Sequence, residues 1–254
     1  MNLNYKSFGQ GPALIICHGL FGSLDNWVSH ARYFSQHFSV FAVDLRNHGR
    51  SPHHPDWNYQ IMAEDLLTFM DQQGIMEAHL LGHSMGGKVV MQAACYDPDR
   101  VDHLLVADMA PKPYEPHHTL ILEALNELPL SEIKERQEAN EILTQKIPEA
   151  GVRQFLLKSL GRDEEKKFRW KFNLDVISQN YEQILANIDL EDGFEGPTLF
   201  LSGGQSSYVR KTDEASILSS FPQATFSQIE AAGHWLHADS PDEFRKRVEA
   251  FLPS

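Results

Sequence analysis

Continuous apolar runs alternate with amphipathic segments in the first part of this chain. Residues 13–17, 38–43, 78–81 and 103–107 are short apolar runs of the kind expected for strands buried on both faces of a sheet. Residues 59–73 instead carry apolar side chains at helical spacing, and Gly74 is placed to end that helix. Strands separated by helices predict right-handed crossovers and a mostly parallel central sheet flanked by helices, which is an α/β fold.

The pattern changes after Pro111. Residues 112–192 contain helical patterns and no long apolar run, with predicted helices at 119–128, 131–146, 148–160 and 175–188. Strand and helix patterns then resume at 197–202, 213–221, 224–229 and 241–252. We therefore expect a core formed by residues 1–111 and 193–254, with an all-helical cap, residues 112–192, as an insertion. The active site should lie under this cap, at the carboxyl ends of the strands.

The most informative local motif is Gly82-His83-Ser84-Met85-Gly86, between a predicted strand and a predicted helix. Gly-x-Ser-x-Gly in this context is typical of a nucleophile elbow, in which a sharp turn exposes the serine. The flanking glycines fit a turn that is too tight for Cβ atoms. Ser84 is therefore a candidate nucleophile, and a serine hydroxyl needs a general base within hydrogen-bond reach. The alternative is an ordinary structural turn.

A histidine and a carboxylate for this serine are found later in the chain. His234 lies between the last strand and the last helix and is the candidate base, while His237 is expected to cap or pack. No carboxylate follows the strand 197–202 closely, since Asp213 is expected in a helix. Asp108 directly follows the strand 103–107 and is the candidate acid. Its alternative role is that of a helix cap or hinge residue.

Stabilising an oxyanion requires backbone N–H donors near the nucleophile. Met85, which follows the serine, is one candidate. The second is expected in the loop after the strand 13–17, at Leu20, with Phe21 as the alternative. Phe21 and Trp235 are also candidate substrate contacts.

Composition narrows the remaining functions. The net charge of −13 argues against binding to nucleic acid or to an anionic membrane surface. The polar start and the absence of a long apolar run predict a cytoplasmic protein with no membrane insertion. Cys17 and Cys95 are expected to be buried free thiols. The histidine pairs 53–54 and 117–118 lack carboxylate partners, so neither a metal nor another cofactor is expected.

Four motifs in order resemble those of the α/β-hydrolase superfamily: His18-Gly19, Asp44-x-Arg46-x-x-Gly49-x-Ser51, Gly82-x-Ser84-x-Gly86 and Gly233-His234. Their surroundings, together with residues 203–209, resemble more narrowly the bacterial YbfF-type esterases and the related mitochondrial abhydrolase-domain proteins. The resemblance implies a small serine esterase with a helical cap and an acid after the sixth strand, which agrees with Asp108. We interpret residues 44–51 as loop scaffolding.

The expected substrate is a small acyl ester or acyl thioester, and acyl-coenzyme A is one candidate. Basic side chains in residues 153–171 would then meet its phosphates, or they simply form a solvated helix face. The same triad would also serve carbon–carbon bond hydrolysis, a lyase reaction or perhydrolysis. A non-catalytic ligand-binding module on this scaffold is the alternative of another class. The oligomeric state is not predicted.

Overall fold

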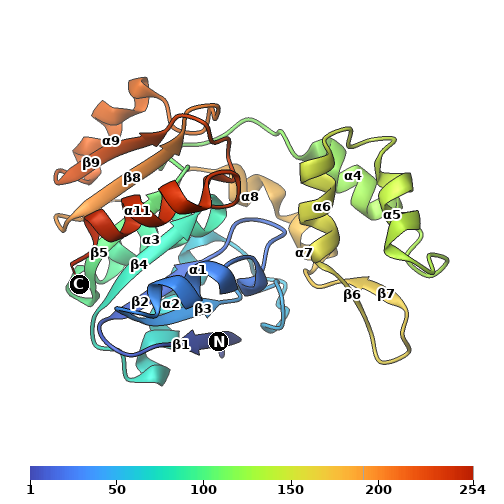
Figure 1. Cartoon of the computed structure of the whole chain (residues 1–254), viewed down its shortest axis with the longest axis horizontal. Helices are drawn as coiled ribbons and strands as arrows, with labels where there is room; N and C mark the ends of the chain where they lie inside the picture. The colour runs from blue at the N-terminus through green and yellow to red at the C-terminus, as the bar shows by residue number, and fades with distance from the viewer. Residues whose placement is uncertain (191, 254) are drawn as a thin grey trace.

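The computed structural model describes residues 1–190 and 192–253. Its centre is a seven-stranded sheet, in the order β1-β3-β2-β4-β5-β8-β9 (Figure 1). These strands are β1 Tyr5–Phe8, β2 Ala13–Cys17, β3 Ser39–Val43, β4 Ala78–His83, β5 Val101–Ala107, β8 Thr198–Gly203 and β9 Ala224–Ile229. Every strand pair is parallel except β1 with β3. The predicted α/β fold with a mostly parallel sheet is confirmed.

Helices cover both faces of this sheet. The flanking elements are α1 Val28–Phe34, α2 Tyr59–Gln73, α3 Met85–Tyr96, α9 Glu214–Ser220, α10 Leu236–Asp239 and α11 Pro241–Phe251, with 3-10 turns at Leu24–Asn26, Pro98–Arg100 and Lys211–Asp213. Ile15 and Cys17 of β2 belong to one apolar cluster with α2, α3 and α9, while Leu14 and Ile16 belong to a second with α1, α10 and α11. This alternation is why the β2 run is apolar at every position.

The segment between β5 and β8 stands to one side of the sheet in Figure 1. It contains α4 Thr119–Glu127, α5 Arg136–Leu143, α6 Ala150–Lys158, β6 Leu160–Arg162, β7 Phe168–Trp170, α7 Leu174–Gln179 and α8 Tyr181–Leu185. The expectation of an all-helical insertion was wrong, because β6 and β7 form an antiparallel hairpin. Gly161, which directly follows the helix predicted at 148–160, lies within β6 and pairs with Arg169. Lys166, at φ 65°, lies in the tight turn that joins the two strands.

Two further differences concern strand count. The sequence pattern did not predict β1, because this edge strand is mostly exposed and carries polar side chains, so it lacks an apolar run. With β1 included, the insertion follows the fifth strand in chain order, one fewer than the sixth-strand position implied by the resemblance. Within the described ranges, no helix is both long and apolar enough to cross a membrane.

Candidate active site

Ser84 lies at the sharp turn between β4 and α3. Its backbone has φ 54° and ψ −120°, a conformation that L-residues rarely adopt. A Cβ on Gly82 would lie 2.2 Å from the Gly86 carbonyl oxygen, and one on Gly86 would lie 2.4 Å from the Cys17 carbonyl oxygen. Both flanking positions therefore require glycine, as the motif predicted. The turn leaves the serine side chain facing a cavity, at the carboxyl end of the strand.

A continuous hydrogen-bonded chain links Ser84, His234 and Asp108. The Ser84 Oγ lies 2.9 Å from His234 Nε2, and His234 Nδ1 lies 2.7 Å from Asp108 Oδ2. A carboxylate only accepts hydrogen bonds, so this arrangement puts the imidazole proton on Nδ1 and leaves Nε2 to accept the serine proton. The structure thus brings together the three side chains that the sequence analysis grouped.

Asp108 is fully buried, and two donors, one at the end of β8 and one in the loop that follows it, hold its carboxylate. Oδ1 accepts the Gly203 N–H at 3.1 Å, and Oδ2 accepts the Ser206 hydroxyl at 2.5 Å. The loop that lacks a carboxylate in the sequence therefore supplies donors to a carboxylate from the neighbouring strand. Asp108 itself has φ 50°, so it shares the strained backbone of Ser84. Ser206 carried no sequence signal that pointed to this role.

The imidazole of His234 is held from two further sides. The His83 Nε2–H donates to the His234 carbonyl at 2.8 Å, which fixes the loop. The Tyr208 ring stacks on the imidazole with a centroid distance of 3.8 Å and an interplanar angle of 16°. His237 instead stacks on Trp27 inside the core, as the packing interpretation expected. Sequence reasoning missed His83 and Tyr208 as neighbours of His234.

The loop after β2 packs against the serine turn. A Cβ on Gly19 would lie 3.1 Å from the Ser84 Cβ, so the two backbones approach closely. The Phe21 N–H is already engaged, because it donates to His48 Nε2 at 3.3 Å. Across the described residues, the N–H groups of Leu20 and Met85 have no acceptor. This distinguishes Leu20 from Phe21 as the available donor.

Two buried histidines support that loop. The His18 Nδ1–H donates to the Gly19 carbonyl, and its Nε2 accepts the Leu45 N–H. The His48 Nδ1–H donates to the Arg46 carbonyl, so its Nε2 is free to accept from Phe21. Burial lowers the pKa of His18 to about 4 and that of His48 to about 3. Both rings are therefore neutral scaffolding at neutral pH, and nothing in the sequence pattern indicated this use of His48.

The segment 44–51 is structural, as interpreted. The Asp44 carboxylate accepts the backbone N–H groups of Leu24 and Arg50 and the side-chain amide of Asn4. Gly49 lies so close that a Cβ there would be 2.1 Å from this carboxylate. Arg46 is paired with Asp65, at 2.5 Å, and not with Asp44.

Lys88, one turn beyond the serine in α3, is a buried cation that sequence reasoning did not single out. Its Nζ donates to the Ala186 carbonyl at 2.6 Å and lies over the rings of Tyr59 and Tyr114, at 5.2 and 5.1 Å. Burial lowers the pKa of Lys88 to about 7. This side chain fastens α3 to the end of the inserted segment.

The serine opens into a mostly apolar cavity of about 240 Å³. Phe21 and Trp235, the two expected substrate contacts, line it. The inserted segment adds four apolar side chains, Ile121, Val152, Phe155 and Leu156, and the imidazoles of His117 and His118. The rings of Phe155 and Trp235, 5.4 Å apart, also border an outer groove of about 440 Å³ that contains Lys158 and Arg245. The site therefore offers an apolar chamber next to a more polar groove.

Comparison with known proteins agrees with this architecture. Residues 12–132 match the family described as alpha/beta hydrolase fold. The chain is 40% identical to Esterase YbfF of Escherichia coli over 94% of this chain and 92% of that protein. It is 39% identical to the sn-1-specific diacylglycerol lipase ABHD11 of Mus musculus, over 95% of this chain and 81% of that protein. A solved structure titled marine microorganism esterase superposes with a TM-score of 0.97 at 40% identity, covering 99% of this chain and 100% of the other. The chain therefore belongs to the α/β-hydrolase family, and relatives at 39–40% identity are named as a lipase and an esterase.

Proposed function

We propose that this ester hydrolase acts as a serine esterase, with Ser84 as nucleophile, His234 as general base and Asp108 as the acid that orients it. The observation that carries the proposal is the unbroken chain of hydrogen bonds from Ser84 through His234 to a fully buried carboxylate, opening into an apolar cavity. A hydroxyl beside a correctly protonated imidazole is the arrangement that nucleophilic acyl transfer needs.

In the acylation step, the Ser84 Oγ attacks the ester carbonyl carbon while His234 Nε2 takes its proton. The carbonyl oxygen becomes an oxyanion, for which the unengaged N–H groups of Leu20 and Met85 are the proposed donors. Each such donor contributes roughly 3 kcal/mol to transition-state stabilisation. His234 then gives the proton to the departing alkoxide, so an alcohol leaves and an acyl-serine remains.

Deacylation repeats these transfers with water in place of the serine. His234 accepts a proton from the water, whose oxygen attacks the acyl carbon, and the proton returns to Ser84 Oγ as the acid leaves. Asp108 stabilises the imidazolium formed in both halves of the cycle. The balanced reaction is ester plus water to acid plus alcohol, and the proposed steps use no metal or organic cofactor.

We propose that residues 112–192 form a lid over this site. The cavity lining supports this, because α4 and α6 contribute Ile121, Val152, Phe155 and Leu156. Ser159 also donates to the Phe21 carbonyl at 2.7 Å, which connects the segment to the loop of the proposed oxyanion donor. Apolar side chains on a lid suit an apolar acyl group and keep bulk water away from the acyl-enzyme.

Among acyl substrates we propose a neutral oxygen ester before acyl-coenzyme A. The basic residues 153–171 do not gather at the cavity: Arg153 donates to the Ile147 and Pro148 carbonyls, and Arg162 lies over the Phe168 ring. Lys158 is the member of this group that lines the outer groove. The mouse relative is named for a diacylglycerol substrate, which is also a neutral ester.

The decisive test compares wild type with Ser84→Ala on p-nitrophenyl butyrate, and both with a fluorophosphonate probe. We expect the variant to lose turnover and labelling, while Ser219→Ala, an exposed hydroxyl elsewhere, keeps both. Wild-type rates in Ser84→Ala would refute the assignment.

A second experiment tests the substrate class. The KM for butyryl-coenzyme A and the KM for the neutral ester are each measured at rising salt concentration. A lower, salt-sensitive KM for the thioester would overturn the preference for neutral esters.

A further inference from the structure

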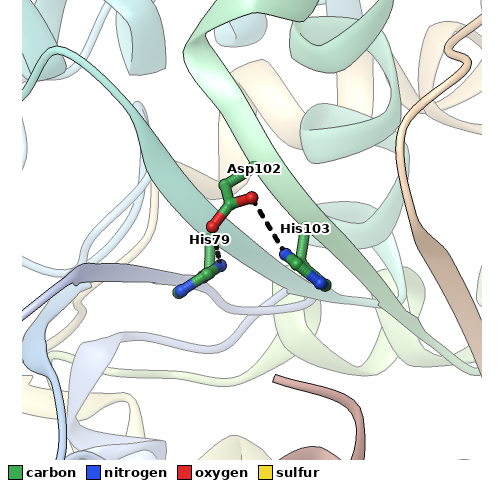
Figure 2. A group of neighbouring side chains, drawn as sticks. All are labelled: His79, Asp102 and His103. Atoms are coloured by element: carbon green, nitrogen blue, oxygen red, sulfur yellow. Dashed lines mark ion pairs between the residues drawn. The ribbon is translucent and has the colours of Figure 1, made fainter. Parts of the chain in front are cut away.

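Three side chains that the proposed reaction does not use meet at the opposite end of the central strands. His79 lies at the start of β4, and Asp102 and His103 lie at the start of β5, as Figure 2 shows. In that view both imidazoles approach the Asp102 carboxylate from their own strands. The ligand-capable atoms of all three lie within 4.8 Å of one another.

An irregularity in the sheet brings these three side chains together. Ala78 pairs with Val101 and Leu80 pairs with Leu104, so the single residue His79 stands opposite both Asp102 and His103. In a regular strand, neighbouring residues point to opposite faces. The bulge places Asp102 and His103 together opposite His79. Bulges of this kind commonly redirect side chains at functional positions.

Within the described part of the chain, each of the two rings has one buried nitrogen atom without a hydrogen-bond partner. His79 is 2% exposed, and the edge of its ring faces Phe38 at a centroid distance of 5.5 Å. Among the described residues, the Nδ1 atoms of His79 and His103 are buried without a hydrogen-bond partner. They lie 3.4 and 3.2 Å from the two Asp102 carboxylate oxygens, without hydrogen-bond geometry. Buried polar atoms are normally satisfied, so two unsatisfied nitrogens facing one carboxylate call for a ligand.

We propose that His79, Asp102 and His103 bind a divalent transition-metal ion of the zinc type. Two imidazole nitrogens and one carboxylate are a common ligand set for such ions. Metal–ligand bonds of about 2.1 Å in a tetrahedron place neighbouring ligand atoms about 3.4 Å apart. Each imidazole nitrogen lies near this distance from a different Asp102 oxygen: 3.4 Å from His79 Nδ1 to Oδ2, and 3.2 Å from His103 Nδ1 to Oδ1. The Asp102 side chain is 43% exposed, so water completes the coordination.

The site has a structural role in this assignment. His79 and Ser84 lie at opposite ends of β4, about 17 Å apart at the usual rise per residue, so the ion takes no part in ester cleavage. It joins the starts of the two central strands that carry Ser84 and Asp108 at their other ends. The centroids of the His103 and Phe251 rings are also 5.3 Å apart, so the end of the last helix, α11, lies beside this site.

The test uses the full chain, stripped with a chelator and titrated with Co²⁺ and Zn²⁺. We expect one equivalent of Co²⁺ with a visible absorption band, displaced by Zn²⁺, and a higher melting temperature with Zn²⁺. Asp102→Asn and His103→Gln should each weaken binding at least about tenfold, with esterase activity unchanged. Asp56→Asn is the matched control, because Asp56 faces a single exposed imidazole, that of His54.

Both variants alter residues at least partly open to solvent, and circular dichroism verifies that they fold. The proposal is overturned if wild type binds less than one equivalent at micromolar metal. It is also overturned if the two variants bind as tightly as wild type and the Asp56→Asn control, which would place the ion on other histidines. In either case the three side chains form an ion-pair network without a metal.

Discussion

Replacing Asp108 by asparagine tests the proposed triad most sharply, because the surroundings of the carboxylate dictate how an amide must sit. With the amide oxygen toward the Gly203 N–H, the NH₂ group faces Ser206 and His234 Nδ1. Every hydrogen bond is then satisfied, since the Ser206 hydroxyl turns to accept. However, Nδ1 must give up its proton, so Nε2 becomes protonated and no longer accepts the proton of Ser84.

The magnitude follows from comparing this orientation with the flipped one. Flipping the amide keeps the productive tautomer but sets an NH₂ against the Gly203 N–H, which leaves a buried donor unsatisfied at a cost of about 1–3 kcal/mol. The unproductive form is therefore favoured roughly 5- to 150-fold. Loss of the buried negative charge beside the imidazolium costs about 3 kcal/mol more, or roughly a further 100-fold. We expect kcat to fall by about 10³ to 10⁴, near the loss known for the same change in serine proteases.

The assay is steady-state hydrolysis of p-nitrophenyl butyrate, with thermal melting to verify the fold. Asp213→Asn is the control, because Asp213 is the competing carboxylate in the sequence and is paired with Lys112 in the structure. The kcat of the control should stay within about threefold of the wild-type value. A change of that size is too small to indicate the loss of a transition-state contact. An Asp108→Asn rate within tenfold of wild type would refute the reasoning and place the acid elsewhere.

Three other predictions concern stability and specificity. Gly49→Ala should lower the free energy of unfolding by about 4 kcal/mol or more in denaturant titrations, because its Cβ would displace the Asp44 carboxylate. Phe155→Ala should join the cavity to the outer groove and raise kcat/KM for an octanoyl ester relative to an acetyl ester about tenfold. Burial lowers the pKa of His18 to about 4 and that of His48 to about 3, whereas both titrate near 6.5 when unfolded. Each should therefore reduce stability by about 1.4 kcal/mol per pH unit as pH falls from 6.5 to 4, measured by unfolding at each pH.

Each of these predictions has a matched control. Gly74→Ala imposes the same left-handed backbone strain with no atom within 4 Å of the new Cβ, so it should cost about 1 kcal/mol. Equal costs at the two glycines would contradict the clash with Asp44. Leu120→Ala removes an exposed apolar side chain from the inserted segment and should leave chain-length preference unchanged. For the histidines, the control is His48→Gln, which should lose less unfolding free energy per pH unit than wild type between pH 6.5 and 4. If the variant loses as much as wild type, the His48 ring is not the buried neutral group that we infer.

The sequence predicted the strands that are mostly buried. The β2, β3, β4 and β5 runs are mostly apolar because both faces of the sheet are covered, so their pattern alone located the strands within about two residues. The sequence pattern did not predict β1 or the β6–β7 hairpin, for two different reasons. β1 has an exposed edge with no apolar signal, and the hairpin strands are three residues each, too short for any periodicity.

In the candidate site, the sequence predicted the residues that follow strand ends. It did not predict the residues that hold them in place. Ser84, Asp108 and His234 each follow a strand, and parallel strands bring such positions to one edge of the sheet. Ser206, His83, Tyr208 and His48 act through contacts between distant segments, such as the 27 residues that separate His48 from Phe21. No local pattern encodes these contacts. The catalytic roles themselves stay predictions until the variants are measured.

The inserted segment leaves the sheet and returns between two strands that are hydrogen-bonded neighbours. β5 and β8 pair directly, and the Tyr114 N–H donates to the Leu185 carbonyl at 2.9 Å where the outgoing and returning chains meet. The sheet is therefore continuous across β5 and β8 without the insertion. Evolution, or a protein engineer, can exchange this segment and alter the proposed acyl cavity while the strand ends that hold the proposed triad keep their register.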